Sequence, residues 1–281
     1  MFGTLFLAAT PIGNSGDAST RLSDILQSAD IIAAEDSRRA VRLLRDLGIT
    51  APGQIVSFYE AVEDAKTPEL IGQIQNGKSV LVLSDAGMPT VSDPGYRLVR
   101  TAIENDITVR VIPGPSAVLT ALAISGLATD RFTFEGFLPR KSAQRVGALS
   151  ELRHELRTMV FFEAPHRLAE TIKDMSGVFG ENRQAAICRE LTKTHEEVVR
   201  GTFAYLLDWC NREILGEITL VVAGASKVAN DNPDDWVAQV QTRVKLGVSQ
   251  RDAIADVASE LGVAKRDVYD AVLGARAQQS E

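Results

Sequence analysis

Short apolar segments rich in β-branched residues alternate with segments of helical periodicity through the first half of the chain. Five such segments stand out: GTLFLAA (3–9), ADIIAA (29–34), QIVSF (54–58), SVLVLS (79–84) and TVRVI (108–112). This alternation is typical of a parallel sheet with helices on both faces, and it predicts an α/β domain. After the last segment, PGPSA (113–117) predicts a turn, with Ser116 as the N-cap of an apolar helix that ends at Gly126.

The second half of the chain predicts a mixed sheet, because its apolar segments are less evenly spaced. The strand candidates are RFTFEGFL (131–138), TMVFFEA (158–164), QAAICRE (184–190), EEVVRGT (196–202) and GEITLVVAG (216–224). The polar segment SKVANDNPDD (226–235) indicates a linker. We therefore predict an N-terminal α/β domain at 1–118, a second α/β domain at 119–226 that completes a ligand cleft, and a helical module at 233–281.

The helical module has the apolar spacing of a helix-turn-helix, with Gly262 in the turn and Lys265 and Arg266 at the start of the second helix. The apolar positions are Ile254, Val257, Leu261, Val263, Val268 and Val272. Because this segment is net acidic, a small interaction module is favoured over a DNA reader.

Charge and composition narrow the functional classes. The net charge of −7 and a pI near 5.2 argue against a protein coated in positive charge, so any nucleic-acid contact must be local. When the chain is divided into residues 1–137, 138–200 and 201–281, only the middle segment is net positive, with 11 Lys and Arg against 9 Asp and Glu. The two cysteines, Cys188 and Cys210, lack metal-ligand spacing and indicate buried thiols in a reducing cytoplasm. Because the sequence shows neither a signal peptide nor an apolar stretch of ~20 residues, we expect a soluble cytoplasmic protein. The cysteine spacing leads us to expect no bound metal.

The segment SDAGMPTVSDPG (84–95) follows a buried strand and has the features of a ligand-binding loop. Asp85 stands where ligands bind in open α/β sheets, outside the carboxyl ends of the strands. Glycines in this loop let the main chain approach a ligand closely. For Asp93 we favour a different role, as the N-cap of the helix that begins near Pro94.

Two further loops are consistent with a nucleotide or nucleoside ligand. The first loop, ATPIGNSGD (9–17), does not have the dinucleotide-binding spacing. Glu35 and Asp36 nevertheless end the second strand, where a dinucleotide-binding chain places its ribose-binding acid. Ser116 lies at the mouth of a later strand, where helix capping and ligand contact are compatible.

The segment FFEAPHR (161–167) places Glu163, His166 and Arg167 together, a set suited to acid/base work or to holding an anion. No Ser or Cys has the sequence context of a catalytic nucleophile, so the sequence does not support a hydrolase triad. Other basic residues recur in this half of the chain and favour phosphate contact.

In this order, the sequence contains TPIGN, AAEDSRR, SDAGMPTVSDPG, IPGPSA, GFLPRK, FFEAPHRL, RELTKTHEEVVRG and GEITLVVAG. This series resembles the ribosomal RNA small subunit methyltransferase I family, a branch of the tetrapyrrole methylase superfamily. The resemblance implies a two-domain enzyme, with homodimeric members, that binds S-adenosylmethionine between its domains. It further implies methylation of the ribose 2′-oxygen of a cytidine in the decoding region of small-subunit ribosomal RNA, free or in the assembled subunit.

Carried over by position, the resemblance implies a set of cofactor-binding residues: Pro11, Asp85, Gly87, Met88, Pro89, Ser116, Ala117 and Phe162. Glu163, His166 and Glu35 are candidates for a general base, although positioning without a dedicated base is equally consistent with the residues. Local positive charge makes a third set candidates for RNA phosphate contacts: Arg38, Arg39, Arg140, Lys141, Arg167 and Lys193. The chain departs from the family pattern at Ser15 and in SFYEAV (57–62), which puts local substrate contacts in doubt.

Two other functions remain open on the residues alone. One is methylation of a tetrapyrrole such as a corrin precursor, against which the first loop lacks a Gly-Pro-Gly pattern. The other is a ligand-sensing regulator whose C-terminal module binds DNA, against which the module has no basic recognition helix.

Overall fold

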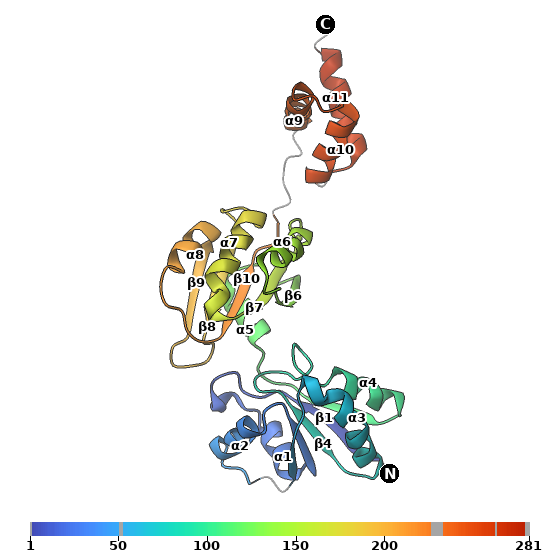
Figure 1. The fold of residues 1–281 in the computed structure, drawn as a ribbon, viewed down its shortest axis with the longest axis vertical. Helices are drawn as coiled ribbons and strands as arrows, with labels where there is room; N and C mark the ends of the chain where they lie inside the picture. The colour runs from blue at the N-terminus through green and yellow to red at the C-terminus, as the bar shows by residue number, and fades with distance from the viewer. Residues whose placement is uncertain (1, 51–52, 226–232, 262, 279–281) are drawn as a thin grey trace.

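The computed structural model describes residues 2–50, 53–225, 233–261 and 263–278. Two five-stranded sheets follow one another along the chain, and a group of three helices follows the second sheet (Figure 1). The predicted two-domain α/β architecture with a helical C-terminal module is confirmed.

Sheet 1 is entirely parallel, with the strand order β3-β2-β4-β1-β5. Its strands are β1 (Thr4–Ala8), β2 (Ile31–Ala34), β3 (Gln54–Ser57), β4 (Val80–Leu83) and β5 (Thr108–Ile112). All residues of β2 and β4 are buried, because helices cover both faces of the sheet. The order makes β2, β4 and β1 neighbours, so the loops that follow these three strands meet at one edge.

Four helices cover sheet 1, two on each face. The helices are α1 (Thr20–Ser28), α2 (Ser37–Asp46), α3 (Glu60–Gln75) and α4 (Tyr96–Glu104). Alternation along β4 divides the core: Val80 and Val82 pack with residues of α3 and α4, whereas Leu81 and Leu83 pack with residues of α1 and α2.

Sheet 2 is mixed, as predicted, with the order β6-β7-β10-β8-β9 and one parallel pair, β6 with β7. Its strands are β6 (Phe132–Phe137), β7 (Thr158–Glu163), β8 (Gln184–Arg189), β9 (Glu197–Thr202) and β10 (Ile218–Val222). One face packs against α6 (Ser142–Glu151), α7 (Leu168–Phe179) and α8 (Phe203–Trp209). Cys188 and Cys210 are free and buried within this domain, as expected.

The other face of sheet 2 is covered by α5 (Ala117–Ser125), whose Val118, Ala121 and Leu122 pack against Val160 and Val221. The helix has the predicted ends, with the Ser116 hydroxyl capping it and Gly126 in the left-handed conformation after it. The division of the chain at 118 and 119 falls inside α5 and stays a proposal.

The C-terminal helices α9 (Pro233–Lys245), α10 (Gln250–Leu261) and α11 (Lys265–Gln278) enclose a small core of their own, which includes Trp236, Val257 and Val268. Residues 226–232 of the predicted linker and Gly262 of the predicted turn lie outside the described residues. The end of that predicted linker is wrong, because 233–235 form the first turn of α9. Proline suits the first position of a helix, and Asp234 and Asp235 favour its positive N-terminal end. Within the described ranges, no helix combines the length and apolarity needed to cross a bilayer.

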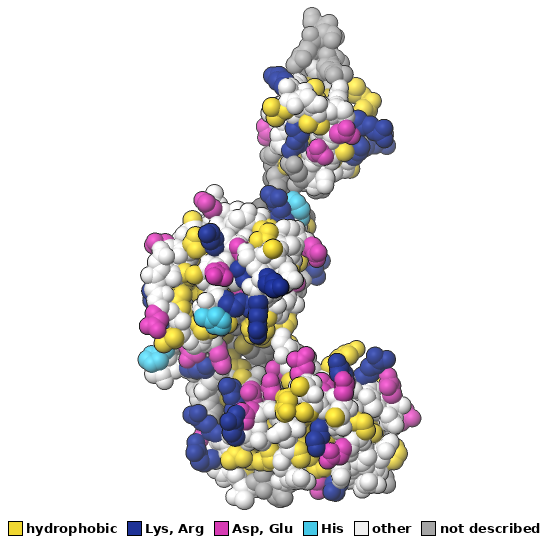
Figure 2. Space-filling view, in the orientation of Figure 1, with side chains coloured by type: hydrophobic (Ala, Val, Ile, Leu, Met, Phe, Trp, Pro, Cys, Tyr) yellow, Lys and Arg dark blue, Asp and Glu magenta, His cyan; other side chains and the backbone are white. Residues whose placement is uncertain are grey.

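Charge is unevenly distributed over the surface. Figure 2 shows Lys and Arg side chains gathered over α2 on the lower body, whereas Asp and Glu side chains crowd the rim of that body nearest sheet 2. The protein is net acidic, but it therefore carries at least one basic surface.

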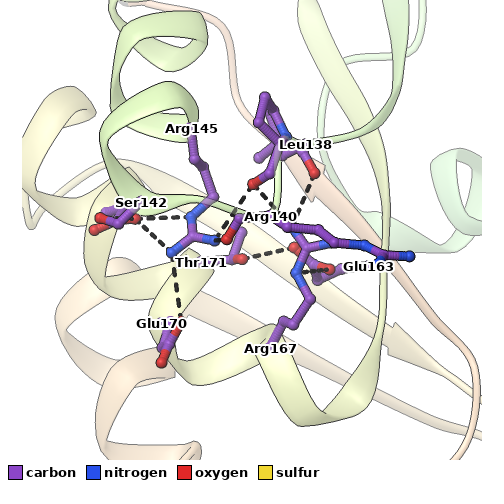
Figure 3. A network of polar contacts seen from close by, with 10 residues as sticks. Leu138, Arg140, Ser142, Arg145, Glu163, Arg167, Glu170 and Thr171 are labelled. Carbon is purple, nitrogen blue, oxygen red and sulfur yellow. Dashed lines mark hydrogen bonds and ion pairs between the residues drawn. The ribbon is translucent and has the colours of Figure 1, made fainter.

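A buried ionic network holds the turn that follows β6 (Figure 3). The Arg145 side chain is only 1% exposed; its Nε donates to Asp174 at 2.7 Å, and its Nη1 donates to the Arg140 carbonyl at 3.3 Å. From the other side, Nη2 of Arg167 donates to the carbonyls of Leu138 and Pro139 at 2.8 and 3.1 Å. Two guanidinium groups thus fix this turn next to the end of β6.

We predict that Arg145→Met destabilises the protein by roughly 3 kcal/mol, because it leaves the Asp174 carboxylate without its countercharge and the Arg140 carbonyl without its guanidinium donor. Denaturant unfolding measures the change. Arg100→Met is the control, since Arg100 is 68% exposed and pairs with Glu104 at the surface, and the expected loss is below ~1 kcal/mol. Adding Asp174→Leu to Arg145→Met restores part of the loss. Equal stabilities for Arg145→Met and the wild type would contradict the assignment.

Candidate active site

A cleft of about 380 Å³ lies between the two sheets, at the carboxyl edge of sheet 1. Sheet 1 contributes Glu35 after β2 and the loop after β4, including Asp85–Met88 and Val91–Asp93. The second domain contributes the start of α5, the ends of β6 and β7, and residues 216–219 at the start of β10. This is the edge where open parallel sheets bind ligands.

Backbone hydrogen bonds between loops form the floor of the cleft. Thr10 and Gly87 exchange both of their backbone hydrogen bonds, at 2.9 and 3.1 Å, and thereby join the first loop to the loop after β4. Gly87 has a φ of +81°, a conformation that glycine adopts without strain. The Thr10 hydroxyl also donates to the Ser84 carbonyl at 3.2 Å. The position of Asp85 is therefore fixed by its neighbours on both sides.

Five acidic residues line the cleft. Glu35, Asp85 and Asp93 lie on two loops of the first domain, and Glu163 and Glu217 belong to the second domain. The Asp85 amide donates to Glu35 Oε2 at 3.1 Å, and the Asp36 amide donates to Asp85 Oδ1 at 3.1 Å. Arg39 Nε lies 3.4 Å from Asp85 Oδ2. Burial raises the pKa of Glu35, and burial together with repulsion from Glu35 raises the pKa of Asp93 to about 7.

The predicted N-cap role of Asp93 is wrong. Helix α4 begins at Tyr96 after Gly95, whose φ of +124° suits glycine. The first amides of the helix are satisfied by Glu63 from α3, whose Oε1 accepts from the amides of Gly95 and Arg97 at 3.1 and 2.9 Å. Because this buried carboxylate occupies the capping position, Asp93 lines the cleft instead.

The loop around Asp93 carries backbone strain. Thr90 and Ser92 have φ values of 76° and 64°, in a region that residues other than glycine rarely adopt. A Cβ placed on Gly136, at the β6 irregularity, would lie 3.8 Å from the Ser92 hydroxyl oxygen. The strained loop thus approaches the second domain across the cleft, and such strain is commonly concentrated at functional sites.

The opposite wall of the cleft is apolar. The Phe162 ring lies 4.9 Å from that of Phe134 and 5.5 Å from that of Phe137, measured between ring centres. Ala117, Val118 and Ile218 of the second domain add apolar surface to this wall. The cleft therefore joins a negatively charged side to an aromatic side, and it suits a ligand with a flat apolar part and a positive charge.

The structure brings most of the predicted cofactor residues together. Those that line the cleft are Asp85, Gly87, Met88, Ser116, Ala117 and Phe162. Pro11 lies beside the cleft, in an adjoining groove, and Pro89 is not a lining residue. Sequence reasoning missed Asp93, Phe137 and the 216–219 segment as cleft residues. The position of Phe137 at the end of a predicted strand is a signal that would have identified it.

Of the two predicted catalytic residues, Glu163 faces away from the aromatic wall. Its side chain is fully buried, and its carboxylate accepts from the Thr171 hydroxyl at 2.6 Å and from the Ala164 amide at 2.8 Å (Figure 3). Phe162 and Glu163 are consecutive in β7, so their side chains point to opposite faces of sheet 2. These contacts favour an anchoring role for Glu163. His166 is exposed on the short helix Pro165–Arg167. A catalytic role for either stays a prediction.

The six predicted RNA-binding residues fall into two groups. Arg38 and Arg39 are exposed on α2, and Arg140 and Lys141 are exposed after β6. Arg167, by contrast, is largely buried and holds the 138–139 carbonyls. Lys193 bridges the carboxylates of Glu190 and Glu217 at 2.7 and 3.0 Å. The geometry therefore supports phosphate contact for the first four only.

Lys193 also belongs to the contact between the domains. A Cβ on Gly13 would lie 2.4 Å from Lys193 Cγ, so the first loop can approach the second domain only with glycine there. The Asn14 amide donates to the Thr192 hydroxyl at 3.1 Å. Among the described residues, no three His, Cys, Asp or Glu side chains are arranged to hold a metal ion.

Relatives with close sequence similarity are known. A protein from Mycobacterium tuberculosis (strain CDC 1551 / Oshkosh) named ribosomal RNA small subunit methyltransferase I is 50% identical over 98% of this chain and 96% of its own length. A protein of the same name from Halalkalibacterium halodurans is 43% identical over 95% of this chain and 94% of its own length. Another from Escherichia coli O157:H7 is 39% identical over 95% of this chain and 93% of its own length.

Solved structures share the fold at low sequence identity. Diphthine synthase matches 78% of this chain and 89% of its own, with a TM-score of 0.60 and 14% identity. Uroporphyrin-III C-methyl transferase from Thermus thermophilus, in complex with S-adenyl homocysteine, matches 78% of this chain and 97% of its own, with a TM-score of 0.56 and 16% identity.

The family of tetrapyrrole (corrin/porphyrin) methylases matches residues 4–207, which include both sheets except β10. Together with the relatives named above, this match confirms the resemblance found in the sequence motifs. The chain therefore belongs to the tetrapyrrole methylase family and, within it, to the ribosomal RNA small subunit methyltransferase I group.

Proposed function

We propose that this protein transfers a methyl group from S-adenosylmethionine to small-subunit ribosomal RNA, at the ribose 2′-oxygen of a cytidine in the decoding region. The observation that carries the proposal is the cleft, which opposes three carboxylates to an aromatic wall. The name shared by its relatives supports the RNA substrate. A homodimer and a cytoplasmic location belong to the same proposal, since the ribosomal substrate is cytoplasmic.

The residues of the cleft fit S-adenosylmethionine. The adenine ring matches the apolar wall that includes Phe137 and Phe162, while the ribose hydroxyls and the positive charges match Glu35, Asp85 and Asp93. A volume of about 380 Å³ falls in the range of small-molecule sites. A solved neighbour of the same fold contains S-adenyl homocysteine, which supports this use of the cleft.

When bound, the cofactor supplies an electrophilic methyl group. The contribution of the protein is positioning, because methyl transfer requires the accepting oxygen to approach in line with the bond that breaks. The fixed Thr10–Gly87 floor and the Phe162 wall hold the two sides of the cleft in place. The carboxylates favour positive charge in the cleft, and the partly buried surroundings strengthen this attraction.

The alternative substrate is a tetrapyrrole, which the names of some of the structural neighbours indicate for those proteins. Those neighbours are at most 20% identical to this chain, so they indicate the fold and not the substrate. A DNA-binding regulator gains no support, because α11 carries Asp267 and Asp270 beside Lys265 and Arg266.

The proposal is tested by incubating the protein with labelled S-adenosylmethionine and, separately, small ribosomal subunits, a tetrapyrrole precursor and duplex DNA. We expect label in the ribosomal RNA alone, and a ribose methyl group on one cytidine when the site is mapped. Label in the tetrapyrrole alone would replace the proposed substrate. No label in any of the three would contradict the proposed reaction.

We predict that Asp85→Ala lowers S-adenosylmethionine affinity by at least about tenfold, equivalent to ~1.4 kcal/mol, because it removes a charge fixed at the floor of the cleft. Calorimetry measures the affinity. Asp24→Ala is the matched control, since Asp24 is exposed on α1 and lies outside the cleft. Unchanged affinity in Asp85→Ala would show that the ligand does not use this carboxylate.

We predict that S-adenosylmethionine affinity rises with pH through about 7, the pKa of Asp93. Below this pH the Asp93 carboxyl is protonated and neutral, and above it the carboxylate attracts the cationic ligand. Binding should therefore lower the pKa of Asp93 and release protons near neutral pH, which calorimetry in buffers of different ionisation enthalpy detects. Asp93→Asn should abolish both the rise and the release. Persistence of both in that variant would assign them to another group.

A further inference from the structure

A second depression adjoins the cleft on the side of α2. It measures about 450 Å³ and lies between α2, the first loop and the second-domain residues Lys193 and Glu217. Arg39, Asp85 and Glu217 line both this depression and the cleft, so the two are continuous. We call it the α2 groove. A polymeric ligand that places one monomer in the cleft therefore has room for the neighbouring monomers in the α2 groove.

The outer side of the α2 groove is basic. Arg38, Arg42 and Arg45 follow the i, i+4, i+7 spacing of a single helix face, opposite the buried Ala40 and Leu44. Their side chains are 89%, 75% and 74% exposed. Figure 2 shows this face as the densest group of Lys and Arg side chains on the lower body in that view.

The acids near this face neutralise it only in part. Asp36 pairs with Arg38 through two hydrogen bonds, at 2.7 and 3.1 Å, so the less completely paired arginines are Arg42 and Arg45. Asp46 lies 3.6 Å from Arg42 and 3.5 Å from Arg45, so one carboxylate serves two guanidinium groups. These pairs are exposed and weak, and a phosphate can displace them at little cost. Guanidinium groups bind phosphate through two parallel hydrogen bonds, which makes such a row of arginines suitable for a nucleic-acid backbone.

The negative charge of the cleft argues against a route of the RNA backbone through the cleft itself. Glu35, Asp85 and Asp93 repel phosphates, so a polyanionic substrate can present its target nucleotide there only if its backbone stays outside. The adjoining α2 groove holds both signs of charge, with Asp46, Asp85 and Glu217 alongside Arg39, Arg42 and Lys193. Because Lys193 is bound to Glu190 and Glu217, the positive charge open to a phosphate there comes from Arg39 and Arg42.

We propose that the α2 groove and the arginine face of α2 bind the sugar-phosphate backbone of the RNA next to the methylated nucleotide, with Arg42 and Arg45 contacting phosphates. This inference rests on the proposed function and adds to it the route of the strand. Neither Arg42 nor Arg45 borders the cleft, so their contribution is to RNA affinity and not to cofactor binding.

The test compares the full-length double variant Arg42→Gln/Arg45→Gln with Arg100→Gln. Arg100 is a matched control, because it is 68% exposed and pairs at i, i+4 with Glu104 on α4 of the same domain, as Arg42 does with Asp46 on α2. Affinity for the small ribosomal subunit is measured over a range of salt concentrations, and S-adenosylmethionine affinity is measured in parallel.

For the double variant we expect RNA affinity to fall at least about tenfold, and the slope of log affinity against log salt to lose about 0.7–0.9 for each phosphate contact removed. Cofactor affinity should stay at the wild-type value, and Arg100→Gln should match the wild type throughout. An unchanged salt slope in the double variant overturns the inference, even when the wild type methylates the subunit. Failure of the wild type to methylate any RNA instead refutes the proposed function on which the inference rests.

Discussion

The structure depends on holding like charges together in a half-buried cleft. Glu35 and Asp85 are stabilised as carboxylates by backbone amides of the neighbouring loop, and Arg39 adds a partial countercharge. At Asp93, burial and repulsion from Glu35 outweigh a hydrogen bond from the Ser84 side chain and raise the pKa to about 7, so the carboxyl is protonated in part at neutral pH. A ligand that brings positive charge removes the repulsion that the folded protein otherwise tolerates, which ties the stability of the cleft to its use.

This negative cleft determines where a polyanion can bind. Strand β2 ends at Ala34, Glu35 and Asp36 follow it, and α2 begins at Ser37. Acids after the strand and arginines on the helix therefore lie within a few residues of each other. The fold thereby places a site for a cation beside a surface for an anion. A reaction between a cationic methyl donor and an RNA requires both kinds of site in contact, and neither net charge nor composition shows this pairing.

Periodicity was sufficient to predict the ten strands and the order of the domains, because buried strands and amphipathic helices leave local patterns. The roles of individual polar residues were not predictable in the same way. Asp93 is adjacent to a helix start, yet Glu63, 30 positions earlier, supplies the cap. Lys193 and Arg167 are residue types that commonly bind phosphate, but tertiary contacts with Glu217 and the 138–139 carbonyls occupy them. Such partners are distant in sequence and leave no local signal.

The buried ionic groups around the cleft share a structural purpose. Glu63 caps α4, Arg145 and Arg167 hold the turn after β6, and Glu163 anchors the start of α7 through Thr171. Each of these groups has a hydrogen-bond partner within the protein, although Arg167 Nε makes no hydrogen bond and lies 3.4 Å from Glu163 Oε1. The carboxylate of Asp93 is matched less completely, because Glu35 repels it. Arg42 and Arg45 are also matched less completely, because they share Asp46. Incomplete neutralisation, rather than the presence of charge, therefore distinguishes the residues available to ligands from those that maintain the fold.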